Sequence, residues 1–106
     1  MSNHIIVGHY KSNTTIKGAY GSLDINSADS DSGKLEGKLT CGFPETDGML
    51  ESAWFQANPN GGANVTFKVK SIQYNLVVPD NKYKSMDGAM SENGSSNPIS
   101  FIHPHR

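Results

Sequence analysis

Alternation of apolar and polar residues at every second position is the dominant pattern of this chain. It runs through residues 23–25, 35–39, 65–69 and 72–78. Such alternation is typical of β-strands that place one face on a core and the other in water, and no helix-length window holds apolar residues at a 3.6 spacing. The pattern therefore predicts an all-β fold, a small antiparallel β-barrel or curled β-sandwich of about 6–9 short strands.

Length and charge narrow the class of protein further. A chain of 106 residues with 35% hydrophobic residues fits one β domain spanning residues 1–106. A formal net charge of -1 supplies no field that would collect nucleic acid, and the longest apolar runs are too short for membrane insertion. Because Cys41 is the single cysteine, no internal disulfide is possible, and we expect a cytoplasmic protein or one exported without a visible signal peptide.

Turn-forming residues separate the expected strands. Residues 27–33 predict a hairpin loop, and residues 58–62 (Asn-Pro-Asn-Gly-Gly) predict a turn that pairs a strand at 49–57 with one at 63–70. Alternation shifts phase at Ser71 with no Gly or Pro beside it, which predicts a β-bulge within one long curved strand. Residues 85–98 are rich in Ser, Gly and Asn, and we expect a mobile loop there.

One hairpin resembles a known family. Residues 21–25 (Gly-Ser-Leu-Asp-Ile) and 33–40 (Gly-Lys-Leu-Glu-Gly-Lys-Leu-Thr) are similar to a hairpin of the avidin family. The resemblance spans residues 21–40, which are 20 of the 106 residues, and implies a hairpin of a curled antiparallel sheet. Leu39 stands where that family has a tyrosine, and no Trp-Ser-Gly-Gln-like segment follows. A biotin site is therefore not predicted.

Catalytic and cofactor motifs do not stand out. The acidic stretch at 24–31 lacks the Gly and the bidentate acid that a calcium loop needs, since Lys34 and Thr40 occupy those places. No G-x-G-x-x-G or phosphate loop is present, so no cofactor is predicted. Nothing local would activate Cys41 as a nucleophile. A small β-barrel enzyme with a dispersed site, involving Asp47 or His9, remains one alternative.

Histidines near the two ends offer a candidate metal site. His103 and His105 are two residues apart and would share one strand face. Removal of Met1 before the small Ser2 would leave a free amine with His4 as the third residue, an arrangement suited to square-planar Cu(II) or Ni(II). The alternative is that these histidines occur by chance at a flexible terminus and bind no metal.

Aromatic and amide side chains point instead to recognition. Stackable rings and neutral hydrogen-bonding groups bind sugars or polar peptides without charge attraction; the candidates are Trp54, Asn58, Asn60, Tyr74, Gln73 and Asp47. The preferred interpretation is a non-enzymatic module that binds a carbohydrate or a protein partner through loops at 41–48 and 58–62 and a nearby aromatic face. An inward Trp54 and Tyr74 would indicate a calyx for a small apolar ligand. An open edge strand would allow a homodimer.

Overall fold

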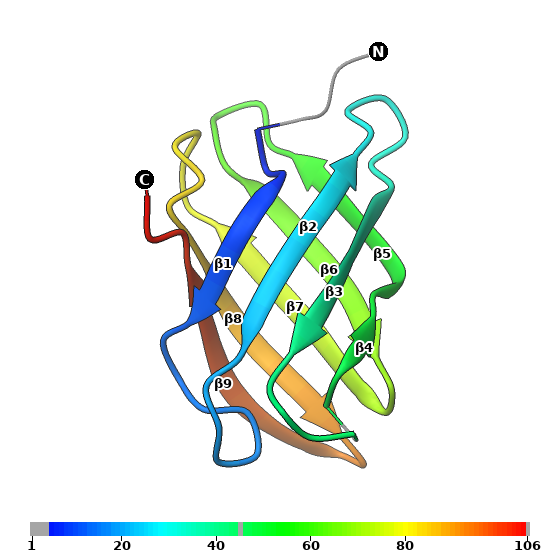
Figure 1. Cartoon of the computed structure of the whole chain (residues 1–106). Helices are drawn as coiled ribbons and strands as arrows, with labels where there is room; N and C mark the ends of the chain where they lie inside the picture. Colours follow the sequence, from blue (N-terminus) through cyan, green and yellow to red (C-terminus); the bar gives the residue numbers. More distant parts are fainter. Residues whose placement is uncertain (1–4, 45, 106) are drawn as a thin grey trace.

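The computed structural model describes residues 5–44 and 46–105, and Figure 1 shows their arrangement. Nine strands form within these residues: β1 (Gly8–Ser12), β2 (Ser22–Ala28), β3 (Leu35–Thr40), β4 (Gly48–Met49), β5 (Glu51–Ala57), β6 (Ala63–Val69), β7 (Ile72–Val78), β8 (Ser85–Glu92) and β9 (Ser95–Ile102). The described part of the chain contains no helix of the length and apolar character that crossing a bilayer requires. The predicted all-β class and the expected range of strands are confirmed.

The strands form one antiparallel sheet in the order β4-β3-β2-β1-β9-β8-β7-β6-β5. Apart from β1 and β9, all neighbours in this order are consecutive in the sequence, so the chain runs as a meander. The edge strand β5 meets β3 at a seam, where Lys34, the residue before β3, forms an isolated bridge with Trp54. Gly33 O accepts a 2.7 Å hydrogen bond from Phe55 N, and Gly37 O accepts a 3.0 Å bond from Leu50 N. These contacts nearly close the sheet into a barrel.

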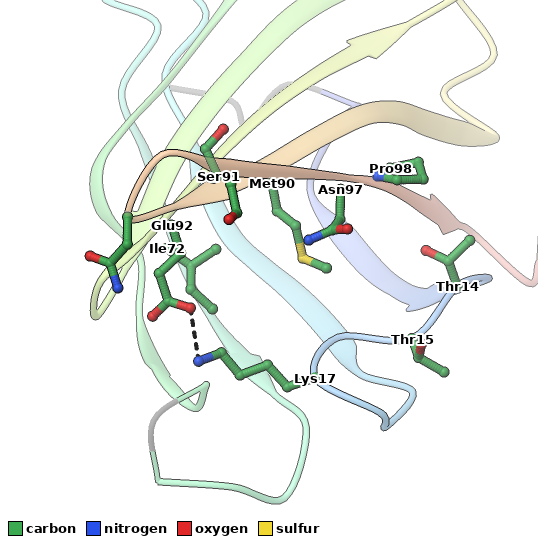
Figure 2. A pocket seen from close by; sticks show the side chains of 11 residues that line it. Thr14, Thr15, Lys17, Ile72, Met90, Ser91, Glu92, Asn97 and Pro98 are labelled. Atoms are coloured by element: carbon green, nitrogen blue, oxygen red, sulfur yellow. Dashed lines mark ion pairs between the residues drawn. The ribbon is translucent and has the colours of Figure 1, made fainter.

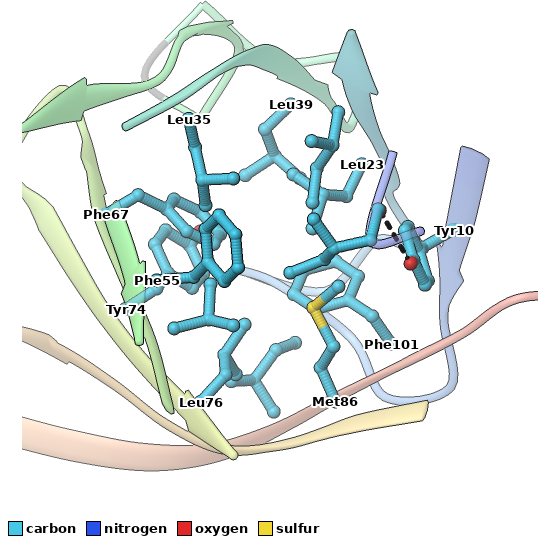
Figure 3. Close-up of a cluster of buried hydrophobic side chains, with 14 of the residues drawn as sticks. Tyr10, Leu23, Leu35, Leu39, Phe55, Phe67, Tyr74, Leu76, Met86 and Phe101 are labelled. Carbon is cyan, nitrogen blue, oxygen red and sulfur yellow. Dashed lines mark hydrogen bonds between the residues drawn. The ribbon is translucent and has the colours of Figure 1, made fainter. Parts of the chain in front are cut away.

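The barrel interior is filled by the apolar half of each alternating strand (Figure 3). On β6 and β7 every second residue is buried, and the residues between them, all polar except Val77, face outward. The Phe67 and Tyr74 rings stack with centroids 4.8 Å apart, and the Phe101 ring lies 6.4 Å from that of Tyr74. The period-two pattern thus marks the inward face, as expected from strand geometry.

The hairpin predicted around residues 27–33 forms between β2 and β3, and the turn predicted at 58–62 joins β5 to β6. The expected bulge at Ser71 is wrong. Lys70 and Ser71 form a tight turn instead, and β6 pairs back on β7 from Ala63 opposite Val78 to Val69 opposite Ile72. Lys70 takes a positive φ of 56° there, a conformation that glycine usually supplies. A two-residue reversal also shifts the parity of the alternation, which the sequence pattern did not distinguish from a bulge.

Two further expectations differ from the structure. Residues 85–98, expected as a mobile loop, form β8 and the first half of β9, which pair from Ser85 opposite Ile102 to Glu92 opposite Ser95. The strand expected over 49–57 divides into β4, which pairs with β3, and β5, which pairs with β6. The division arises because the chain crosses the seam here, with Ser52 at a positive φ of 50° and a register shift between Glu51 and Trp54.

Candidate functional site

Trp54 lies on the outside of the barrel. Its neighbour Phe55 is only 4% exposed and points into the core, whereas Trp54 is 44% exposed. Successive residues of a strand face opposite sides, so an inward Phe55 fixes an outward Trp54. The inward Trp54 that the calyx alternative required is therefore not observed.

Mostly neutral polar side chains lie around Trp54 on the outer face of β5, β6 and β7, with the charged Lys68 beside them, opposite Gln73. Trp54 pairs with Thr66, which pairs with Asn75, so these three side chains form one row across the strands. Adjacent strands lie about 4.8 Å apart, which makes the row roughly 10 Å long. A parallel row holds Gln56 opposite Asn64. We call this surface the amide face; its members are Trp54, Gln56, Asn64, Thr66, Gln73 and Asn75.

Hydrogen bonds within the amide face orient its central carboxamide. Asn75 Oδ1 accepts bonds from Thr66 Oγ1 and from Gln73 Nε2, each at 3.4 Å. Gln73 Nε2 also donates to the Tyr74 carbonyl at 3.3 Å. With its oxygen engaged, the Asn75 side chain has its Nδ2 group to offer as a donor to a bound molecule. Gln73, one of the residues expected to bind, thus shares a face with Trp54.

Two hollows flank Trp54 along the seam. The first, about 760 Å³, runs between β3 and β5, and its wall includes Glu36, Met49 and Ser52. The second, about 580 Å³, lies toward the β2–β3 loop, with Asp31, Ser32 and Gln56 in its wall. Trp54 lines both, so the exposed indole forms the ridge between two depressions whose walls carry both apolar and polar groups.

Tyr74, a second residue expected to bind, lies in the core. Its side chain is 0% exposed and stacks on Phe67. Burial raises the pKa of the Tyr74 hydroxyl, and the negative forms of Cys41 and Glu92 raise it further. Tyr74 is therefore separated from the amide face by the sheet itself.

The remaining predicted residues belong to loops. Asn58 closes the β5–β6 turn, since its N–H donates to Gly62 O at 3.0 Å and its carbonyl accepts from Gly61 N at 3.1 Å; Asn60 is exposed at the tip. Asp47 organises the β3–β4 loop by accepting from Cys41 N and from Gly42 N. The hydrogen bond that the Asp47 carboxyl accepts from the Cys41 N–H is the main reason why the pKa of this carboxyl is lowered. These contacts give Asp47 a structural role within its loop.

Histidines do not assemble a metal centre among the described residues: no group of three or more His, Cys, Asp or Glu side chains there is placed to hold an ion. The His103 and His105 rings lie 6.1 Å apart, but His103 Nδ1 accepts a 3.2 Å hydrogen bond from His105 N. His9 Nδ1 pairs with Asp24 across the β1–β2 ladder, which places it in a contact separate from Asp47. His4 lies outside the described residues.

Sequence reasoning missed Asn64 and Thr66 as members of the candidate surface. The available signal was their position, since both alternate with the buried Ala63, Val65 and Phe67 and must face outward once those residues face the core. What sequence could not supply was the cross-strand register that sets Thr66 beside Trp54.

Comparison of the chain with protein-family models, curated proteins and solved structures finds no match.

Proposed function

We propose that this protein is a non-enzymatic recognition module that binds a neutral carbohydrate on the amide face. The observation that carries the proposal is the row Trp54–Thr66–Asn75, in which a half-exposed indole continues into a hydroxyl and a carboxamide on adjacent strands. A recognition site on paired strands is held more rigidly than one on a loop.

The chemistry of the row matches a sugar ring. One face of a pyranose presents C–H groups, which pack on the flat, apolar surface of an indole. Its edge presents hydroxyls, which both donate and accept, as do the carboxamides of Gln56, Asn64 and Asn75. A net charge of -1 gives no long-range attraction for a charged ligand, so a neutral ligand fits the protein best.

The hollows beside Trp54 provide room for a chain of sugar units. A saccharide stacked on the indole would extend along the Thr66–Asn75 row in one direction and into the seam in the other, where Ser32, Glu36 and Ser52 supply oxygen atoms. Several weak contacts of this kind add up to modest affinity, and we expect a Kd in the micromolar to millimolar range.

A titration of Trp54 fluorescence with soluble neutral oligosaccharides tests the proposal. The chain has a single tryptophan, so its emission reports this surface alone. We expect a saturable change with at least one of a set of cello-, malto-, xylo- and chito-oligosaccharides. In calorimetry, W54A should weaken binding about tenfold or more, because an aromatic anchor often contributes over 1.4 kcal/mol.

Tyr20 supplies the matched control. It is the most exposed aromatic residue described, at 69%, and lies outside the amide face, so Y20A should bind like the wild type. If no oligosaccharide gives a saturable response, the carbohydrate proposal is wrong, and a protein partner becomes the hypothesis to pursue. Equal losses in W54A and Y20A would likewise contradict a specific site.

A further inference from the structure

A pocket of about 600 Å³ opens at one end of the barrel and shares no lining residue with the amide face (Figure 2). It exists because β1 pairs with β9 only at Lys11–Ile102 and Ser12–Phe101, so the first half of β9 extends beyond its neighbour. The segment 13–21 covers this gap in part, with Asn13 N bonded to Ser100 O at 2.7 Å. The volume lies within the range of small-molecule sites.

The pocket has an apolar floor and a polar rim. Ile72 and Met90, both buried members of the barrel core, form the floor. The rim carries the paired charges of Lys17 and Glu92 and, for the rest, mainly hydroxyl and carboxamide groups, contributed by Thr14, Thr15, Ser91, Ser95 and Asn97. This combination suits a small molecule with an apolar body and neutral polar groups.

Contacts between three turns fix the shape of the pocket opening. Lys17 Nζ lies 2.8 Å from Glu92 Oε1, and Ser71 Oγ donates to Glu92 Oε2. Lys17 occupies a tight turn at a positive φ of 51°, closed by paired bonds between Ile16 and Ala19. The turns of residues 16–19, 70–71 and 93–94 thus converge on one carboxylate beside the pocket.

A buried hydroxyl lies behind the floor. Tyr74 is directly opposite Met90 in the β7–β8 ladder, so the two inward side chains are neighbours. Within the described chain, Tyr74 Oη is buried and has no hydrogen-bond partner. A ligand oxygen that reached this hydroxyl would remove the cost of burying it without a partner.

We propose that the barrel-end pocket binds a small neutral molecule whose apolar body packs on Ile72 and Met90 and whose acceptor oxygen takes a hydrogen bond from Tyr74 Oη. The unbranched Met90 side chain changes rotamer to admit the oxygen, as flexible methionines readily do. The ligand's other polar groups meet the rim at Ser91 and Asn97. This site shares no residue with the amide face, so the two binding proposals are tested independently.

Methyl NMR of the full chain with cyclohexanone as the probe tests the proposal. The probe carries one acceptor oxygen on a compact apolar body. We expect a saturable shift of the Met90 ε-methyl, identified by its loss in M90L. Met86, fully buried elsewhere in the core, and Met49, exposed at the seam, serve as internal controls and should show no saturable shift.

Y74F isolates the hydroxyl. Phenylalanine keeps the stacking on Phe67 and removes an unsatisfied polar group, so the variant should fold at least as stably as the wild type. We expect cyclohexanone affinity to fall about fivefold to tenfold in Y74F. Absence of a saturable Met90 shift, or equal shifts at Met49, would overturn the pocket; unchanged affinity in Y74F would overturn the role of Tyr74.

Discussion

Lys17 and Glu92 form an ion pair with Nζ and Oε1 2.8 Å apart, joining the 16–19 turn to the β8–β9 hairpin. The two residues are far apart in the sequence, and the contact ties the first part of the chain to the last at one barrel end. The hydrogen bond from Lys17 and that from Ser71 lower the pKa of the Glu92 carboxyl below its usual range.

Lowering the pH should weaken the Lys17–Glu92 ion pair. A lowered folded-state pKa means that ionised Glu92 stabilises the fold at pH values above its unfolded pKa, and that this contribution is lost as pH falls through the folded value. In E92Q that part of the pH dependence should be missing, with wild type and variant converging at the acid end. Thermal unfolding between pH 7 and pH 3 measures it.

Glu36 gives the control for this experiment, because its ion pair with Lys34 is longer, at 3.7 Å, and exposed. E36Q should keep the wild-type profile. An E92Q profile that runs parallel to that of the wild type at all pH values would contradict the role assigned to Glu92.

Cys41 should react slowly with thiol reagents at neutral pH. Burial raises the pKa of its thiol, and the nearby Asp47 carboxylate also raises it, so the reactive thiolate is scarce. The rate of alkylation by iodoacetamide should lie below that of glutathione at pH 7 and keep rising with pH above the usual thiol range. In denaturant the rate should approach that of a free cysteine. A native rate at pH 7 above that of glutathione would refute this assignment.

A side chain at position 37, in place of Gly37, should destabilise the fold. Gly37 is buried on β3 opposite Ile25, and a Cβ there would lie against the carbonyl oxygen of Asp24, closer than van der Waals contact allows. The obstacle is backbone of β2, which cannot move without disturbing the β2–β3 ladder. We expect G37A to lower the free energy of unfolding by ~1–3 kcal/mol, measured by urea denaturation. K38A, at the exposed neighbour, should cost far less; equal effects would show that close packing is not the cause.

Trp54 should be accessible in the native state. With 44% of its side chain exposed, acrylamide should quench its emission efficiently before unfolding, and unfolding should raise the quenching constant only modestly. A native quenching constant near zero would place the indole inside the barrel and remove the basis of the amide face.

Local pattern predicted much of the barrel. Alternation identified the strands that became β2, β3, β6 and β7, and the side chains that fill the core. It failed where the backbone does something that no glycine or proline signals, as at Lys70, whose positive φ turns an expected bulge into a hairpin. It failed also at 85–98, where small polar residues form β8 and the start of β9 because β8 is paired along its length between β7 and β9.

The chemistry of the candidate site could be predicted from the sequence, but the full set of residues that form it could not. Trp54 and Gln73 were expected to bind and do share a face, whereas Tyr74 was assigned to the same surface and lies in the core. A single strand's sequence leaves both faces open until the packing of neighbours decides. Asn64 and Thr66 joined the surface only once the β5–β6 register set them beside Gln56 and Trp54.

Mapping of amide and indole NMR shifts during titration with a neutral oligosaccharide tests the central claim most directly, because it shows where binding occurs. We predict saturable shifts confined to the Trp54 indole N–H, the side-chain amides of Asn75, Gln73 and Asn64, and the seam beside β3. Saturable shifts confined to the Asn58–Gly62 turn or to the barrel-end pocket, with the Trp54 indole unmoved, would contradict it.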